Sequence, residues 1–196
     1  MKVLIFISLL LLACGKTHRL SKSDLQWNPY TVGDRLIFQS GNTLFDTVIV
    51  TGMVRHTRGL GYPFSGNPDK GQSLSVVVNH LVSDPGSFRG LKKGSIFIMS
   101  NYGKGSYVTF WFAGVTKGES ISNPFFIGNL DTIKPITYST KAGTFDDVVV
   151  IKSDTVYPDN FDRLSTIFWS RKFGYLEIEV NDSLKWELIG RLPAPK

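Results

Sequence analysis

The chain has 196 residues, of which 42% are hydrophobic, 13% aromatic and 19% charged, a composition that excludes an intrinsically disordered protein. Lys and Arg residues number 22 against 16 Asp and Glu residues, which gives a formal net charge of +6. The chain contains one cysteine, which excludes an internal disulfide framework and a zinc site built from several cysteines.

The N-terminus carries the pattern of an export signal. Lys2 precedes an unbroken apolar run from Val3 to Leu12. A helix that spans a membrane needs about 20 apolar residues, so this run is too short for one. It fits the hydrophobic region of a signal peptide. The sequence therefore predicts a signal peptide over residues 1–13.

The end of this run, Leu11-Leu12-Ala13-Cys14, resembles the lipobox of bacterial lipoproteins. The resemblance implies that Cys14 receives a diacylglycerol, becomes the first residue of the mature protein and anchors it in a bilayer. Gly15, in place of Asp, implies sorting to the outer membrane, and the lack of an acidic run in Lys16–Arg19 favours its periplasmic face. A plain secretory signal with an incidental cysteine is the alternative.

Residues 14–26 are polar and basic, and we expect them to form a short tether behind the lipidated cysteine. Nothing in residues 27–196 has the composition of a linker between domains. We therefore expect one folded β domain over residues 27–196.

The pattern from Trp27 onward is that of β-strands. Apolar and polar residues alternate in 74–82, 107–112, 176–180 and 184–188. The last two runs flank the turn-forming Asn181–Ser183, which predicts a closing hairpin with one apolar and one charged, solvent-facing side. Further strands are expected at 35–39, 44–54, 95–99, 133–137, 145–151 and 164–169. About ten short-linked strands predict an all-β fold, either an antiparallel sandwich or a half-open barrel.

Two segments carry family resemblances. Residues 27–38, WNPYTVGDRLIF, resemble the opening of uncharacterised Bacteroidetes lipoproteins, in which a W-x-P-Y-x-x-G-D segment enters the first strand. Residues 143–188 resemble half-barrel periplasmic proteins through Phe145–Val148, Phe168–Gly174 and Trp186–Leu188. These motifs are structural, so the resemblance implies a fold and a compartment, without implying a chemistry.

Candidate chemical groups are few. The three histidines lack the spacing of metal ligands, and His80 shares a strand face with apolar residues, so we expect a hydrogen-bonded core residue there. Glu177 and Glu179 share a strand face beside Lys185, which predicts cross-strand ion pairs. We expect no metal, no cofactor and no catalytic residue. The modest charge and the predicted compartment argue against a nucleic-acid partner.

The one surplus in the sequence is aromatic. Phe110, Trp111 and Phe112 place large rings on both faces of one strand. Rings on both faces indicate a covering layer, an interface or a lined cavity, although simple packing on both sides is the alternative. Tyr62 and Phe64, in a glycine-rich segment, are candidates for a flap over such a surface. These five residues are the predicted ligand-binding set.

Together these patterns predict an envelope lipoprotein anchored in the outer membrane and facing the periplasm. Its partners would be the bilayer, through acylated Cys14, and an apolar ligand or an envelope protein held against an aromatic-lined sheet. We favour this non-enzymatic binding or structural module. The alternative is an enzyme acting on envelope glycans or another hydrolase, which would need Asp or Glu residues facing one cleft.

Overall fold

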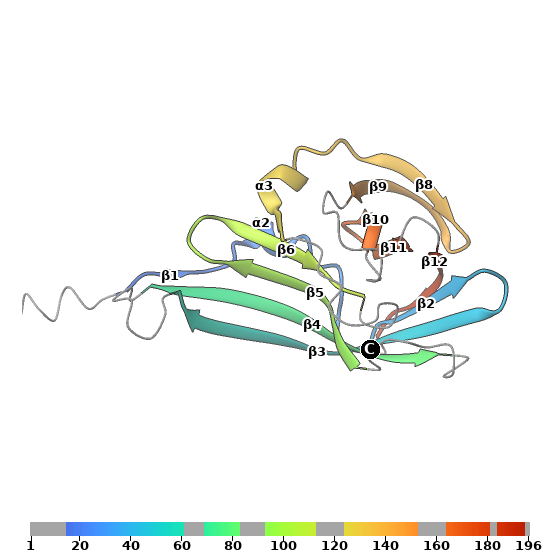
Figure 1. Ribbon diagram of the computed structural model, residues 1–196, viewed down its shortest axis with the longest axis horizontal. Coiled ribbons are helices and arrows are strands. Elements are labelled where there is room, and N and C mark those ends of the chain that lie inside the picture. Colours follow the sequence, from blue (N-terminus) through green and yellow to red (C-terminus); the bar gives the residue numbers. More distant parts are fainter. Residues whose placement is uncertain are drawn as a thin grey trace, which may run out of the picture.

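A computed structural model describes residues 15–60, 69–82, 93–112, 124–152, 164–180 and 184–194. The signal peptide, Cys14, Tyr62, Phe64 and the turn at 181–183 lie outside these residues. The first half contains β1 (Thr17–His18), α2 (Lys22–Leu25), β2 (Arg35–Ser40), β3 (Leu44–Gly59), β4 (Lys70–Val82), β5 (Lys93–Asn101) and β6 (Ser106–Phe110). The second half contains β7 (Phe125–Phe126), α3 (Ile127–Leu130), β8 (Ile136–Thr140), β9 (Gly143–Lys152), β10 (Leu164–Ser170), β11 (Gly174–Val180) and β12 (Leu184–Leu192) (Figure 1).

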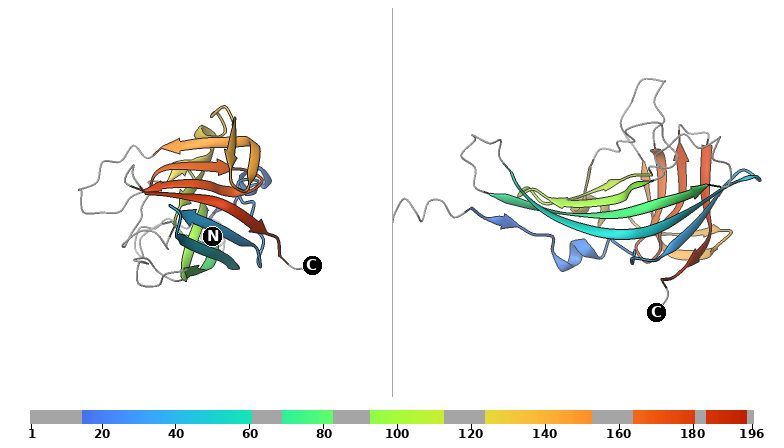
Figure 2. Two further views of the ribbon diagram at one scale, coloured as in Figure 1. Left: turned by 90° about the vertical axis from the view of Figure 1, so that its right-hand side faces the viewer. Right: turned by 90° about the horizontal axis from the view of Figure 1, so that it is seen from below.

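Eleven strands form one continuous antiparallel sheet in the order β7-β6-β5-β4-β3-β2-β12-β11-β10-β9-β8. β1 lies off this path and runs parallel to the start of β4. Strands β3 to β6 form an extended arm, and β9 to β12 stand side by side across it (Figure 2). The sheet therefore curls into a half-barrel, which confirms the all-β prediction and selects the half-open barrel over the sandwich.

Extra residues in single strands help the sheet to bend. The register shifts at Thr51 between β3 and β4, at Ile96 between β4 and β5, and at Ile189 between β12 and β2. Such bulges increase local twist and turn a strand away from its neighbour's direction. Beyond the far strand β8, the backbone N–H of Lys141 donates to Glu187 of β12 at 2.6 Å, so the sheet curves back on itself at this end.

Aromatic side chains from the arm (β3 to β6) and from the strands that stand across it (β9 to β12) meet in the core. The ring of Phe97 on β5 stacks on Trp169 of β10 at 4.9 Å between centroids. Phe110 on β6 contacts the edges of Trp169 and Tyr175. All four side chains are buried. Because β5 and β6 are far from β10 and β11 in the sheet order, these contacts hold the curl closed.

The closing hairpin lies as predicted, with Ile178 paired to Trp186 and Glu179 to Lys185. Its apolar side is buried, apart from Leu184 at the hairpin end. The other side differs from the solvent-facing surface that we expected. Glu177 there is only 8% exposed, and its carboxylate accepts a hydrogen bond from the Tyr138 hydroxyl.

Some element boundaries were predicted wrongly, and short elements were missed. The strand expected at 133–137 begins only at Ile136, after Pro135, whose missing N–H cannot join a ladder. The strand expected at 107–112 ends at Phe110. α2, α3, β1 and β7 have only two to four residues each, too few for a detectable period.

The segment expected to be a tether packs against the sheet from Lys16 onward. The backbone N–H of Leu20, a buried residue, donates to the Gln72 side chain at 3.0 Å. Ser21 and Asp24 then form a capping box that starts α2. The polar composition of this segment therefore reflects hydrogen bonds to the sheet. None of the helices in the described ranges is long and apolar enough to span a membrane.

Candidate functional site

The predicted ligand-binding residues at the end of β6 and just after it, Phe110, Trp111 and Phe112, do not form an exposed surface together. Phe110 and Phe112 are fully buried, and the ring of Phe112 contacts those of Phe38 and Tyr175 at 5.1 and 5.6 Å. Trp111 faces the other way and is half-buried. Packing therefore accounts for the rings of Phe110 and Phe112, which is the alternative that the sequence left open, and ligand binding by the five residues stays a prediction.

An aromatic surface does exist at the hairpin between β5 and β6. We call it the hairpin-tip surface, and it consists of Tyr102, Lys104, Tyr107, Pro124 and Phe126. Four of these residues, all except Phe126, line a cavity of about 330 Å³. Tyr102 is 53% exposed and Phe126 38%. Large rings exposed together on a protein surface indicate a binding site.

Local geometry fixes the rings of this surface. Tyr107 on β6 pairs with Phe126 on β7, and their ring centroids are 5.5 Å apart. Gly105, with a φ of 122°, lies so close to the Phe126 ring that a Cβ at this position would overlap it. Two observations thus require glycine at position 105. Sequence patterns do not bring these residues together, because they come from three separate short segments of the chain.

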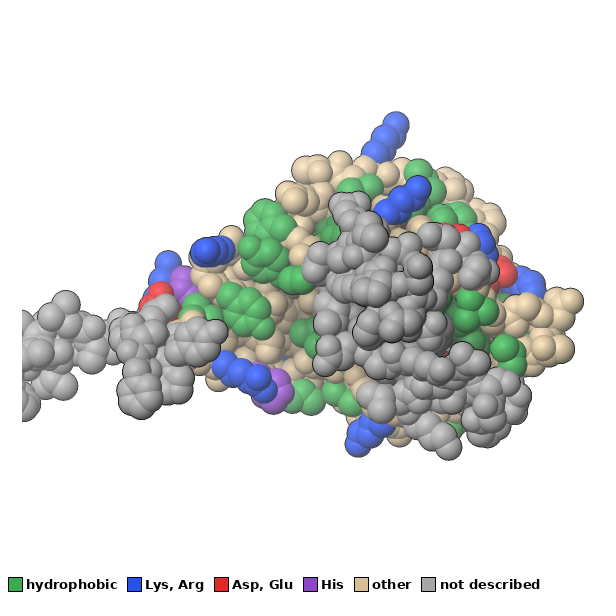
Figure 3. All heavy atoms as spheres, in the orientation of Figure 1, with side chains coloured by type: hydrophobic (Ala, Val, Ile, Leu, Met, Phe, Trp, Pro, Cys, Tyr) green, Lys and Arg blue, Asp and Glu red, His purple; other side chains and the backbone are tan. Residues whose placement is uncertain are grey.

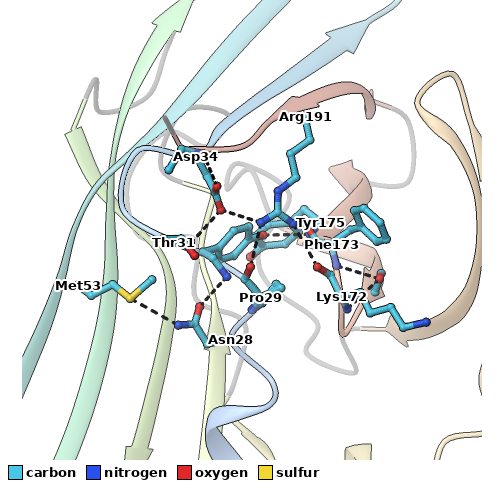
Figure 4. Close-up of polar contacts among 12 residues, drawn as sticks. Asn28, Pro29, Thr31, Asp34, Met53, Lys172, Phe173, Tyr175 and Arg191 are labelled. Atoms are coloured by element: carbon cyan, nitrogen blue, oxygen red, sulfur yellow. Dashed lines mark hydrogen bonds and ion pairs between the residues drawn. The ribbon is translucent and has the colours of Figure 1, made fainter. Parts of the chain in front are cut away.

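A second cluster, drawn in Figure 4, ties the N-terminal corner to β12. Asp34 accepts a hydrogen bond from Arg191 at 2.6 Å, and both side chains are largely buried. Asp34 also accepts from the backbone N–H of Thr31 and of Ala194. Arg191 donates to the carbonyl of Pro29 at 2.9 Å. The carboxylate and the guanidinium are therefore engaged with each other and with the backbone.

The W-x-P-Y-x-x-G-D motif supplies most of this corner. The indole N–H of Trp27 donates to Asp131, and the Arg171 guanidinium lies 4.5 Å from the Trp27 ring centroid. The hydroxyl of Tyr30 accepts from the backbone N–H of Tyr175 at 3.0 Å. A Cβ at Gly174, where φ is 84°, would overlap that hydroxyl. The motif thus has a structural role, as its resemblance implied.

Burial controls the ionisation of the two tyrosines in this region. Both phenols are buried, and burial raises the pKa of Tyr30 and that of Tyr175 well above the ordinary range. The Tyr175 hydroxyl donates to the carbonyls of Ile96 and Trp111 at 2.9 and 3.0 Å. These phenols stay protonated at neutral pH, as donors or acceptors in the core.

Charged residues gather on the outer side of the closing hairpin. Lys185 pairs with Glu177 and Glu179, which confirms the predicted cross-strand pairing. Glu179 and then Glu177 raise the pKa of the Lys185 ammonium. The Tyr138 hydroxyl donates to Glu177 at 2.7 Å, and burial, followed by this carboxylate, raises its pKa. The ring of Tyr138 in turn stacks on that of Phe168.

His80 lies in the core, as predicted. Its Nδ1 is joined by a hydrogen bond of 2.6 Å to Asp46, and both side chains are fully buried. Its ring also contacts that of Phe112 edge-on. Within the described ranges, no three His, Cys, Asp or Glu side chains are grouped so that they could hold a metal ion.

These clusters differ in what they can do chemically. The carboxylates of Asp34, Glu177 and Asp46 are each hydrogen-bonded inside the protein. The described residues that line the hairpin-tip cavity are two tyrosines, a lysine and a proline. An apolar cavity with one ammonium among its described lining residues can bind a ligand by burial and charge.

Comparison with protein-family models, curated proteins and solved structures gave no match. The assignment of a half-barrel rests on the strand order and curvature of the structure alone. The resemblance to Bacteroidetes lipoproteins stays a prediction from the sequence.

The first prediction concerns the corner pair. Arg191→Met should lower the free energy of unfolding by about 3 kcal/mol, because it leaves Asp34 buried without its cation. Urea denaturation measures the change. Lys172→Met at the neighbouring turn is the control, since its pair with Asp146 is exposed on both sides and should contribute less than about 1 kcal/mol. Equal losses in both variants would contradict a structural role for the corner.

The second prediction concerns alkaline stability. Unfolded tyrosines ionise near pH 10, whereas Tyr30 and Tyr175 have raised pKa values and hold their protons in the folded protein. The folded state then binds more protons than the unfolded state, so stability should fall as pH rises above about 10. Urea midpoints and tyrosinate absorbance measure this. Tyr30→Phe should weaken the pH dependence, and a profile that stays flat in the unaltered protein would refute the assignment.

Proposed function

We propose that this protein is a lipoprotein of the bacterial envelope, anchored in the outer membrane by acylated Cys14 and facing the periplasm. Its half-barrel serves as a binding module, without a catalytic role. The lipobox-like Leu11–Cys14 supports the anchor. The exposed apolar cavity at the hairpin-tip surface is the single observation that carries the binding role.

The chemistry of that cavity suggests its ligand class. Its volume of about 330 Å³ lies at the small end of ligand pockets, which suits a short apolar group. Tyr102 and Tyr107 offer ring faces, and Lys104 places an ammonium among them. A ligand that joins an apolar part to a negative charge fits these groups. Both lipids and the side chains of an envelope protein belong to this class.

The binding role is favoured over the hydrolytic one by the distribution of acids. A glycan hydrolase of the usual kind needs two carboxylates about 5–10 Å apart across a cleft. Glu177 accepts hydrogen bonds from Tyr138 and Lys185, which is the arrangement of a carboxylate used for structure. The cavity lining holds an ammonium, phenols and a proline.

The anchor can be tested by metabolic labelling. Cells that express the full chain with radiolabelled palmitate should yield labelled protein in the outer-membrane fraction, and Cys14→Ala should carry no label. Gly15→Asp is the matched control: it should keep the label and move the protein to the inner membrane. Label that still enters Cys14→Ala would refute the anchor.

The binding surface can be tested with the fluorescent probe anilinonaphthalene sulfonate, which combines apolar rings with one negative charge. Tyr102→Ser should lower probe fluorescence several-fold, because the residue lines the cavity. Leu192→Ser is the control, since Leu192 is also 53% exposed but lies outside the hairpin-tip surface. Equal effects of the two substitutions, with circular dichroism unchanged, would show that exposed apolar area alone binds the probe.

A further inference from the structure

The geometry points to one partner for the hairpin-tip surface, namely the lipid–water interface of the anchoring bilayer. We propose that the end of the half-barrel at which β3 ends, β4 begins and the β5–β6 hairpin turns rests on that interface. We call this the distal end. Its tyrosines and Phe126 would lie at the headgroup level, and its basic side chains would contact anionic headgroups. The proposal rests on the proposed anchor at Cys14 and names the partner of the site described above.

The first argument is where the chain meets the sheet. The backbone N–H of Lys70, at the start of β4, donates to the carbonyl of Lys16 at 2.8 Å. The N–H of Lys16 donates to the side chain of Asp69, also at 2.8 Å. Cys14 precedes Lys16 by two residues, and two residues span at most about 7 Å. An acyl group on Cys14 would therefore hold Lys16 and the distal end within about 7 Å of the acylated residue.

The N-terminal segment is fixed to this end by several further contacts. Thr17 and His18 pair with Lys70 and Gly71, just beyond the point where β5 ends at Asn101. The His18 ring lies against Gly103 of the hairpin, close enough that a Cβ there would touch it. Figure 1 shows β1 beside the free ends of the long strands. The attachment thus defines an orientation, which a free tether would not.

The second argument is the distribution of charge. The distal end carries seven exposed basic side chains, namely Lys16, Arg19, Lys22, Arg55, Arg58, Lys70 and Lys104. Its two acids, Asp24 and Asp69, are engaged by Ser21 and Ser106 and by Lys16 and His18, respectively. The other described residues carry nine basic and eight acidic side chains. Almost all the excess positive charge of the described chain therefore lies at one end, where an anionic surface would attract it.

The third argument is the side-chain chemistry between these charges. Tyr102, Tyr107 and Phe126 form an aromatic group, and tyrosine and phenylalanine are favoured at membrane interfaces. Figure 3 shows hydrophobic and basic side chains next to one another on the arm that ends near β1. A mixture of rings and cations around an acylated residue is the pattern of a peripheral membrane contact.

The neighbouring sheet edge fits a lipid partner better than an added strand. The pairing of β2 with β3 begins at Arg35 and Ile49, so the later part of β3 has only β4 beside it in the sheet. That part carries Arg55, His56 and Arg58, all exposed. Charged side chains on an edge strand oppose the pairing of another chain.

A site-specific label tests the orientation in the full lipidated protein. Because acylation consumes the thiol of Cys14, an introduced cysteine would be the only one free to react, and the unaltered protein should take no label. Thr57→Cys places the label at the distal end, and Thr43→Cys places it at the turn between β2 and β3. Both threonines are exposed, and β3 separates them by roughly 40 Å at about 3.3 Å per residue.

The labelled proteins are reconstituted in vesicles of equal parts phosphatidylcholine and phosphatidylglycerol that contain a lipid quencher at the headgroup. We expect quenching of the Thr57→Cys label to be several-fold stronger than that of the Thr43→Cys label. Adding Arg58→Glu and Lys70→Glu to Thr57→Cys should reduce the difference in quenching between the two labels, because these substitutions remove cations that anionic headgroups attract. High salt, which screens this attraction, or vesicles of phosphatidylcholine alone, which lack the anionic headgroups, should reduce the difference as well.

The outcomes separate the two proposals. If the protein floats with the vesicles but both labels are quenched equally, or neither is quenched, the anchor holds and the resting orientation is refuted. Strong quenching at Thr43→Cys alone would place the opposite end on the bilayer and also refute it. If the protein does not float, the anchor itself fails, and the orientation that rests on it fails with it.

Discussion

The buried side chain of Tyr175 is the contact on which the curl of the sheet depends. Its hydroxyl donates to the carbonyl of Ile96 in β5 and to that of Trp111, just after β6, so both acceptors belong to the long arm of the sheet. Its backbone N–H donates to Tyr30 in the N-terminal corner. One residue of β11 therefore joins the arm, the corner and the C-terminal strands. Removing its hydroxyl would take this donor from the carbonyl of Trp111 and from that of Ile96, which keeps the backbone N–H of Trp111 as a donor.

The position of Tyr175 also shows the limit of reading strands from alternation. Strict alternation along β11 places Tyr175 on the same side as Glu177 and Glu179, away from the core. The register shift between β10 and β11 pairs Phe168 with Glu177 and Trp169 with Tyr175, so that Leu176 is the extra residue. The bulge turns Tyr175 inward, and a shift of this kind depends on the neighbouring strand. Alternation predicted the closing hairpin and His80 correctly because neither β4 nor the paired residues of the hairpin contain an extra residue; at the shift between β3 and β4 the extra residue, Thr51, lies in β3.

Long-range contacts also decide which of the alternatives for the aromatic surplus holds at Phe110 and Phe112. Phe110 and Phe112 were recognised as unusual, and their partners Phe38, Trp169 and Tyr175 come from strands that meet them only after the sheet has curled. The exposed rings at the hairpin tip were missed because β7 has only two residues. Composition therefore indicated the number of rings, whereas long-range topology decided which of them are buried.

The half-barrel combines two ends of different character. At one end, the aromatic core and the pair of Asp34 and Arg191 fix the corner from which β2 and β12 run. At the other end, the arm formed by β3 to β6 finishes in exposed cations and in Tyr102. The N-terminal segment crosses between these ends and is hydrogen-bonded to Gln72 and Asn101 on the way. Under the proposed anchor at Cys14, an entry fixed in this way would set how the protein stands on a bilayer, because the segment after the anchor would not be a flexible tether.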